Sequence, residues 1–343
     1  MLKNSYKLLF LLTLMMGTLI SISSSSWLSV WMGLEINLLS FIPLSMKSNN
    51  LFSSEASLKY FLTQAIASST LLFIIIIFMF SELNLFTKKK MILNMCLASI
   101  LMMKSGVAPF HFWFPNVMEG LSWINSFILM TWQKMAPLII LSFCLNFFLF
   151  NATIIISTFI GSMGGLNQTS LRKLLAFSSI NHLGWMISNL INNENLWKIY
   201  FFFYSFLSLT IILTFKNFNI FNINQMFSLK FKTKMMKLFF SLPLLSLGGL
   251  PPFLGFFPKW ITIETLIMNN FILMTFFMIN FTLITLYFYI RICYSSFLLN
   301  HNILNWNFSW VFFSSKNSFW LNFLLFFTIF GLIFINLLFF ILN

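Results

Sequence analysis

The sequence predicts an all-α polytopic membrane protein with about eleven transmembrane helices, two of them broken. Three observations lead to this fold. The chain has 343 residues, of which 59% are hydrophobic and only 8% charged. Long apolar runs follow one another with short polar loops between them. A ten-residue pattern, G-x-x-P-F-x-x-x-F-P, occurs twice inside those runs.

The composition excludes a water-soluble domain, because such domains carry about 25% charged residues. Lysine and arginine number 20 against 6 acids, all glutamate, which gives a formal net charge of +14. The basic residues mostly occupy the loops between apolar runs, where they act as orientation signals, so nucleic acid is not an expected partner. Cys96, Cys144 and Cys293 form no C-x-x-C pair, so neither a metal site nor a disulfide is expected.

A spanning helix needs about 20 apolar residues. The segments that meet this requirement are 6–22, 27–46, 56–80, 91–115, 122–147, 152–168, 171–191, 196–215, 238–266, 270–292 and 318–342. We expect a single transmembrane domain over residues 1–343, with a first half near 1–150, a second half near 151–292 and a C-terminal helix at 318–342.

Positive charge sets the orientation of these spans. Most lysines and arginines fall in loops on the side where the chain begins, which predicts that the N-terminus lies on the positive side of the membrane. The cluster Lys88 to Lys90 goes against this bias. With this threading, spans 91–115 and 238–266 run in opposite directions, as the two halves of an inverted-repeat transporter do.

Glycine and proline interrupt the same two spans. The breaks fall at Gly106 and Pro109 in the first, and at Gly249, Pro251 and Pro252 in the second. Glycine loosens the helical backbone, and proline removes a donor and clashes with the preceding turn. Inside a bilayer, a broken helix is tolerated only where protein or a wet cavity surrounds it. Two breaks in corresponding positions are therefore typical of a transporter built from two related halves.

Four ionisable residues lie deep within the predicted spans: Glu35, Lys104, Lys134 and Lys259. A charge at the bilayer centre costs about 2.5–3.5 kcal/mol, so these side chains are expected to have partners or water. Burial disfavours the charged form of a lysine, and a nearby carboxylate favours it. Such a group can load and release a proton, which predicts a proton relay. The alternative is a set of structural ion pairs that hold the bundle together.

Three further residues are weaker candidates for the relay. His111 lies in the first break and His182 in a later span; both could titrate near neutral pH, or be neutral packing residues. Lys59 follows Glu55 by four residues, which indicates a surface ion pair first. The glycine-rich segment 164–173 lacks the G-x-x-x-x-G-K-[ST] pattern of a phosphate loop, so it is interpreted as a turn between helices.

Seven segments in order resemble the antiporter-like membrane-arm subunits of mitochondrial respiratory complex I, and within them the NADH dehydrogenase subunit 2 family in its insect form. The segments are Trp31–Asn37, Glu55–Gln64, the first break with Lys104, Thr131–Lys134, Gly164–Lys173, Asn181–Trp185 and the second break with Lys259. The family pattern has a glutamate, a lysine at each broken helix and a central lysine. The resemblance maps these positions to Glu35, Lys104, Lys134 and Lys259.

This resemblance implies proton translocation across the mitochondrial inner membrane, driven by quinone reduction in other subunits, with the N-terminus in the matrix. NADH, FMN, iron–sulfur clusters and ubiquinone would belong to those other subunits, and this chain would bind no cofactor. The implied partners are neighbouring membrane-arm subunits and lipids such as cardiolipin. The alternatives are a stand-alone cation/proton antiporter and a scaffold subunit that does not pump.

Overall fold

The structure is a computed structural model that describes residues 5–46, 50–81, 87–228, 234–298 and 323–334. These residues are helical apart from turns and one isolated bridge between Ser170 and Asn222. The all-helical class is confirmed. Within the described residues, seven helices are long and apolar enough to cross a membrane. The chain divides into two compact units, residues 1–157 and 158–343, and each is described on its own.

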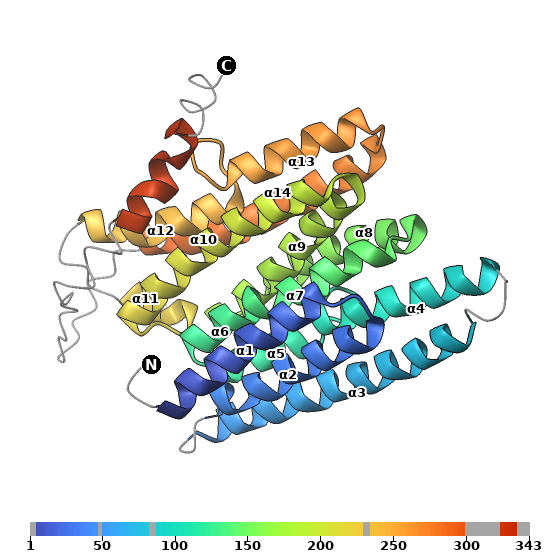
Figure 1. Cartoon of the computed structure of the whole chain (residues 1–343). Helices are drawn as coiled ribbons and strands as arrows, with labels where there is room; N and C mark the ends of the chain where they lie inside the picture. The colour runs from blue at the N-terminus through green and yellow to red at the C-terminus, as the bar shows by residue number, and fades with distance from the viewer. Residues whose placement is uncertain (1–4, 47–49, 82–86, 229–233, 299–322, 335–343) are drawn as a thin grey trace. The chain divides into compact units, whose positions relative to one another are not determined.

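The first unit contains the helices drawn from blue to green in Figure 1. They are α1 (Ser5–Ser23), α2 (Trp27–Ser45), α3 (Leu51–Ser81), α4 (Thr87–Ser105), α5 (Trp113–Gly120), α6 (Trp123–Met130), α7 (Trp132–Leu141), the 3₁₀ turn η1 (Ser142–Cys144) and the first part of α8 (Phe147–Gly165). Helix α2 packs between α1 and α3, and α4 packs against α3 and α7.

Small residues let α1 and α2 approach closely, as is common between helices in membranes. A Cβ atom on Gly17 would come within 2.9 Å of the Asn37 backbone nitrogen, and one on Gly33 within 2.6 Å of the Ser21 nitrogen. This contact holds the face of α2 that carries Gly33 and Asn37 against α1.

The second unit holds the rest of α8 and the helices that follow it. They are α9 (Leu171–Asn192), α10 (Glu194–Phe218), α11 (Ile223–Ser228), α12 (Lys234–Gly248), α13 (Phe256–Met268), α14 (Ile272–Leu298) and a helical segment over Phe323–Phe334. Helix α9 packs on α10 and α13, and α12 packs on α14 and α10. The rest of the expected C-terminal helix, 318–322 and 335–342, lies outside the described residues.

The two repeated patterns end their helices with the same hydrogen-bonded cap. Gly106 has φ +77° and Gly249 has φ +87°, values that favour glycine. At the first, Gly106 N donates to Met103 O (3.3 Å) and Val107 N donates to Met102 O (3.0 Å).

At the second, Gly249 N donates to Ser246 O (3.0 Å) and Leu250 N donates to Leu245 O (3.4 Å). This pair of bonds is the Schellman arrangement, in which a left-handed residue lets two amides return to the last turn. The chain then starts a new helix at Trp113 in one unit and at Phe256 in the other.

A third interruption, at Thr131, was not expected from the sequence. The predicted span 122–147 is divided into α6 and α7, and Thr131 has φ −113° and ψ −74°. Both the Thr131 backbone nitrogen (3.0 Å) and its Oγ1 (2.8 Å) donate to Phe127 O. A threonine hydroxyl that bonds the carbonyl of the preceding turn can bend a helix, but Thr63 and Thr70 make the same bond within the continuous helix α3, so this bond accompanies the interruption without explaining it. Helices α3 and α8 also begin five residues earlier than expected, at Leu51 and Phe147, slightly beyond the error of about two to four residues for predicted helix ends.

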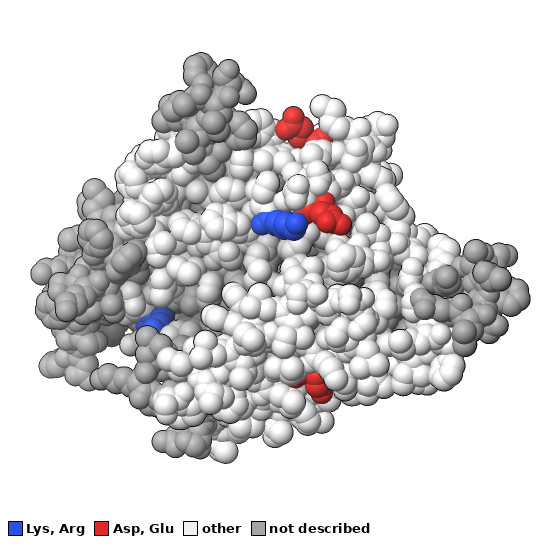
Figure 2. Space-filling view, in the orientation of Figure 1, with Lys and Arg blue, Asp and Glu red and all other residues white. Residues whose placement is uncertain are grey.

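The surface of the protein matches an apolar surrounding. Figure 2 shows few charged side chains on the visible face. Large apolar residues of α1, such as Leu12, Met16 and Leu19, are more than half exposed. In water such a surface would be an association site, and in a bilayer it contacts lipid.

Substituting the two adjacent glycines of the second break tests whether the break requires glycine at position 249. We expect Gly249→Ala to destabilise the full chain by about 1–3 kcal/mol, because the residue needs a positive φ. Its Cβ would also lie 2.9 Å from the Lys259 Cδ and Nζ atoms. Thermal unfolding of the detergent-solubilised chain, followed by tryptophan fluorescence, measures the change.

Gly248→Ala is the matched control, because its Cβ would meet nothing closer than 3.5 Å and alanine favours the helix by up to about 1 kcal/mol. Equal stabilities of the two variants would contradict this account of the break.

Candidate functional site

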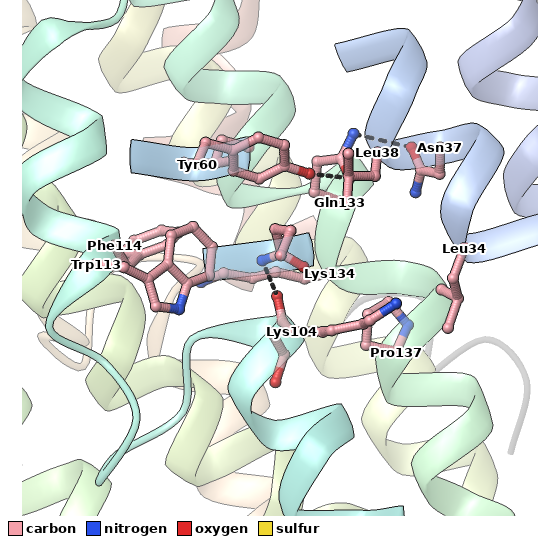
Figure 3. A pocket seen from close by; sticks show the side chains of 13 residues that line it. Leu34, Asn37, Leu38, Tyr60, Lys104, Trp113, Phe114, Gln133, Lys134 and Pro137 are labelled. Atoms are coloured by element: carbon pink, nitrogen blue, oxygen red, sulfur yellow. Dashed lines mark hydrogen bonds between the residues drawn. The ribbon is translucent and has the colours of Figure 1, made fainter. Parts of the chain in front are cut away.

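The first unit encloses a small polar cavity of ≈ 20 Å³ that brings together two of the predicted lysines. Helices α2, α3, α4, α5, α6 and α7 each contribute to its wall, and Figure 3 shows it from close by. The lining residues are Leu34, Asn37, Leu38, Tyr60, Gln64, Lys104, Ser105, Trp113, Phe114, Leu129, Gln133, Lys134 and Pro137.

Lys104 occupies the last turn of α4 and is 7% exposed. The carbonyls at this helix end have no partner within the helix, and side chains from other helices take their place. Gln64 Nε2 of α3 donates to Lys104 O (3.2 Å). Trp113 Nε1 of α5 donates to Met103 O (3.1 Å). These bonds fix the backbone that carries the Lys104 side chain.

Lys134 lies in the first turn of α7, directly after the interruption at Thr131, and is 1% exposed. Its Nζ atom lies 4.6 Å from the ring centroid of Phe114. A ring face at this distance attracts a cation, and more strongly so away from water. The two lysines line the same cavity. Lys104 does so from the end of α4 and Lys134 from the beginning of α7.

A bridge of polar side chains joins three helices at the cavity wall. Tyr60 of α3 donates its hydroxyl hydrogen to Gln133 Oε1 (3.3 Å), and Gln133 Nε2 of α7 donates to Asn37 Oδ1 of α2 (2.9 Å). These bonds are dashed in Figure 3. None of these residues is predicted from the sequence to have a role. The sequence marks two of them only by their proximity to predicted relay residues: Gln133 adjoins Lys134, and Asn37 follows Glu35 by two residues.

Glu35 of α2 is partly exposed, but its Oε2 atom is buried and has no hydrogen-bond partner among the described residues. Within the described part of the chain, no ion pair joins the Glu35 carboxylate to Lys104.

Lys259 belongs to the second unit, where it lies in α13 and is 7% exposed. Its Nζ atom donates to Gly248 O, the last carbonyl of α12, at 2.7 Å. The C-terminal end of a helix carries partial negative charge, which favours a cation there. Pro252 lies four residues after Gly248 and has no N–H, so even an unbroken helix would lack a backbone donor for this carbonyl.

The weaker candidates lie in three different environments. His111 is buried between α4 and α5, with Nδ1 3.2 Å from Pro109 O. His182 is buried in the middle of α9, with Nδ1 2.9 Å from the Tyr200 hydroxyl oxygen. Lys59 is 49% exposed and pairs with Glu55 at 2.6 Å, so the predicted surface ion pair is confirmed.

The described residues contain no group of three His, Cys, Asp or Glu side chains that could hold a metal ion. The lining of the cavity in the first unit offers acid–base groups: two amines, a phenol and three amides. In the second unit these groups are the Lys259 amine and, separately, the pair of His182 and Tyr200.

Two family descriptions match the sequence. The first, described as "NADH:quinone oxidoreductase/Mrp antiporter, TM", covers residues 24–285. The second, "NADH dehydrogenase subunit 2 C-terminus", covers residues 286–339. The first match alone spans most of the chain and includes all four predicted relay residues.

Individual relatives agree with this assignment. The chain is 57% identical over 300 residues to NADH-ubiquinone oxidoreductase chain 2 of Anopheles gambiae, covering 87% of this chain and 88% of the relative. It is 54% identical to the Aedes aegypti protein of the same name, with the same two coverages. A chain in the structure of respiratory complex I from Thermus thermophilus with bound aureothin has the same fold, with a TM-score of 0.78 at 23% identity, covering 86% of this chain and 71% of that one. The chain therefore belongs to the NADH-ubiquinone oxidoreductase chain 2 family, the multi-pass membrane subunits of NADH:ubiquinone oxidoreductase.

Proposed function

We propose that this chain is a proton-translocating subunit of the membrane arm of respiratory complex I, and that Glu35, Lys104, Lys134 and Lys259 carry the protons. Quinone reduction in other subunits would drive the transfer. The observation that carries the proposal is that two lysines, each less than 10% exposed, line one polar cavity in a membrane-embedded unit.

The size of the cavity supports proton exchange between the two lysines. A volume of ≈ 20 Å³ is room for about one water molecule, which needs roughly 10–15 Å³ and two to four polar partners. The two amines and the Gln133 and Gln64 amides can supply those partners. Two ammonium groups this deep in apolar surroundings repel each other, so the pair favours states in which one is neutral. A single proton shared between Lys104 and Lys134 is the low-energy state of such a pair.

In this mechanism, Glu35 determines which of the two lysines, Lys104 or Lys134, holds the shared proton. A carboxylate favours the charged form of a nearby amine, and the buried Oε2 of Glu35 has no hydrogen bond to hold it in place. A change in the charge or position of Glu35 would therefore move the shared proton toward Lys134. The bridge from Tyr60 through Gln133 to Asn37 would keep α2, α3 and α7 in register while this happens.

The second unit would repeat this chemistry at its own break. We propose the full architecture of about eleven spans, with inverted halves near 1–150 and 151–292 and one broken helix in each. The matching glycine caps at Gly106 and Gly249 support it, because paired discontinuous helices are typical of such transporters. Lys259 is the proton carrier of the second half, and His111 and His182 are candidates to extend the path.

The proposal places the chain in the mitochondrial inner membrane, with its N-terminus in the matrix. Its partners are the neighbouring membrane-arm subunits and lipids such as cardiolipin. NADH, FMN, the iron–sulfur clusters and ubiquinone are assigned to the other subunits of the complex.

Removing either lysine at a broken helix tests the relay. We expect Lys104→Met or Lys259→Met to lower NADH-driven proton pumping by the assembled, reconstituted complex by about a hundredfold, the lower end of what a proton-transfer group contributes. Pumping is measured as the pH change inside vesicles, with NADH oxidation followed in parallel. Lys198→Met is the control, since Lys198 is exposed on α10. Pumping that persists in the Lys104 and Lys259 variants would show that the relay is assigned to the wrong residues.

A double variant separates a relay from a scaffold. Glu35→Gln combined with Lys104→Met leaves the formal charge of the site unchanged, so a purely structural role predicts that assembly and pumping both survive. We expect the complex to assemble and pumping to be lost, because neither replacement can carry a proton. Assembly is followed on native gels and pumping in vesicles. A double variant that pumps at the wild-type rate would favour the scaffold.

A further inference from the structure

The second unit contains a much larger cavity, of ≈ 400 Å³, that the proposed relay does not use. It lies where the turn between α8 and α9 meets α11 and the later part of α14. The lining residues are Gly165, Leu166, Asn167, Gln168, Thr169, Leu174, Ile223, Asn224, Phe288, Arg291 and Ile292. The turn is part of the glycine-rich segment 164–173, which lacks the sequence pattern of a phosphate loop.

The walls of this cavity are held by the backbone. Leu171 N donates to Phe221 O (2.9 Å) and Ile223 N donates to Thr169 O (3.0 Å), which joins the turn after α8 to the start of α11. Helix α14 forms a further wall. It can approach the turn closely only because residue 165 is glycine, since a Cβ there would lie 2.8 Å from the Phe288 ring. Phe288 is buried against the turn, and this contact places Arg291, less than one turn further along α14, at the cavity.

The cavity has two kinds of surface. Arg291 is exposed, and no ion pair to it is found among the described residues. The exposed side chains of Asn167, Thr169 and Asn224 add neutral donors, and no acid is among the lining residues. Leu174, Phe288 and Ile292 form an apolar wall. A guanidinium with neutral donors matches the oxygen atoms of a phosphate, and the apolar wall matches hydrocarbon.

The position of the cavity relative to the membrane spans indicates that such a ligand is a lipid. The candidate membrane span in α8 ends at Gly165, which is itself a lining residue. Because the cavity lies around the turn that directly follows this span, its polar lining residues lie at the end of a span, at the level of the lipid headgroups. The adjacent Arg172 and Lys173 begin α9 on the same side of the turn, which adds positive charge that attracts anionic lipid.

We propose that this cavity binds the phosphate headgroup of an anionic phospholipid, with Arg291 as the phosphate ligand and the Phe288 and Ile292 wall against the glycerol and upper acyl chain. The lipid would join the turn after α8 to α14 at one end of the second unit. The site lies apart from Lys259 and is independent of the relay.

Photo-crosslinking on the assembled complex tests this site. A phosphatidylglycerol that carries a diazirine near its headgroup is added to delipidated complex, and labelled peptides are mapped by mass spectrometry. We expect label in α14 near Phe288 and in the turn 165–169. Unlabelled phosphatidylglycerol should compete at least about tenfold better than phosphatidylcholine, and inorganic phosphate should not compete.

Variants of the basic residues complete the test. Arg291→Gln should lower the affinity for the probe by about tenfold or more, the effect of losing a charged hydrogen bond to phosphate. Arg291→Lys should retain part of the binding and serves if the glutamine variant does not assemble. Lys216→Gln is the control, because Lys216 is exposed on α10 of the same unit and does not line the cavity.

Three outcomes would overturn the proposal. They are absence of label from both peptides, equal competition by phosphatidylcholine, and unchanged binding in the Arg291 variants. Competition by inorganic phosphate as effective as that by the lipid would make the cavity a site for a free anion and would equally overturn the lipid assignment.

Discussion

Every helix end and every amine inside this protein must find a polar partner within the protein, because lipid offers none. The broken helices meet this constraint with side chains from elsewhere in their own unit. At the end of α4, Gln64 and Trp113 donate to the last carbonyls. At the end of α12, Lys259 itself is the donor. The buried amines and the buried helix ends therefore occur in the same places for one physical reason.

This arrangement explains why the polar residues of the first unit form a connected set. Gln64 holds the carbonyl of Lys104, and the bridge of Tyr60, Gln133 and Asn37 spans α3, α7 and α2 around the same cavity. A buried polar network stabilises one arrangement only when its members are satisfied. Glu35 Oε2 has no partner among the described residues, and a buried oxygen in this state requires an explanation such as a functional role or a bound water.

The sequence predicted the helical membrane class and located both helix interruptions, because glycine, proline and lysine are conspicuous in apolar runs. It did not predict the interruption at Thr131, because the bond from its hydroxyl to Phe127 O is one that Thr63 and Thr70 also make inside a continuous helix, so the residue type alone does not mark the break. The partners of the lysines were also missed. Asn37 and Gln133 are 96 positions apart, and neither hydropathy nor spacing carries information about which distant amides meet. The family resemblance supplied the charged positions but not the polar bridge between the helices.

The hydrogen bond to Gly248 O allows the Lys259 amine to gain or lose a proton without moving. Pro252 has no N–H, so it cannot donate to the Gly248 carbonyl, and this oxygen accepts from the side chain of Lys259 instead. A neutral amine still has two hydrogens to donate, whereas the ammonium has three. The side chain can thus keep the same anchor in both forms while the strength of the bond changes. A lysine anchored in this way can exchange its proton while its side chain stays in one position. The motions that transfer of the proton requires then belong to the surrounding water and helices.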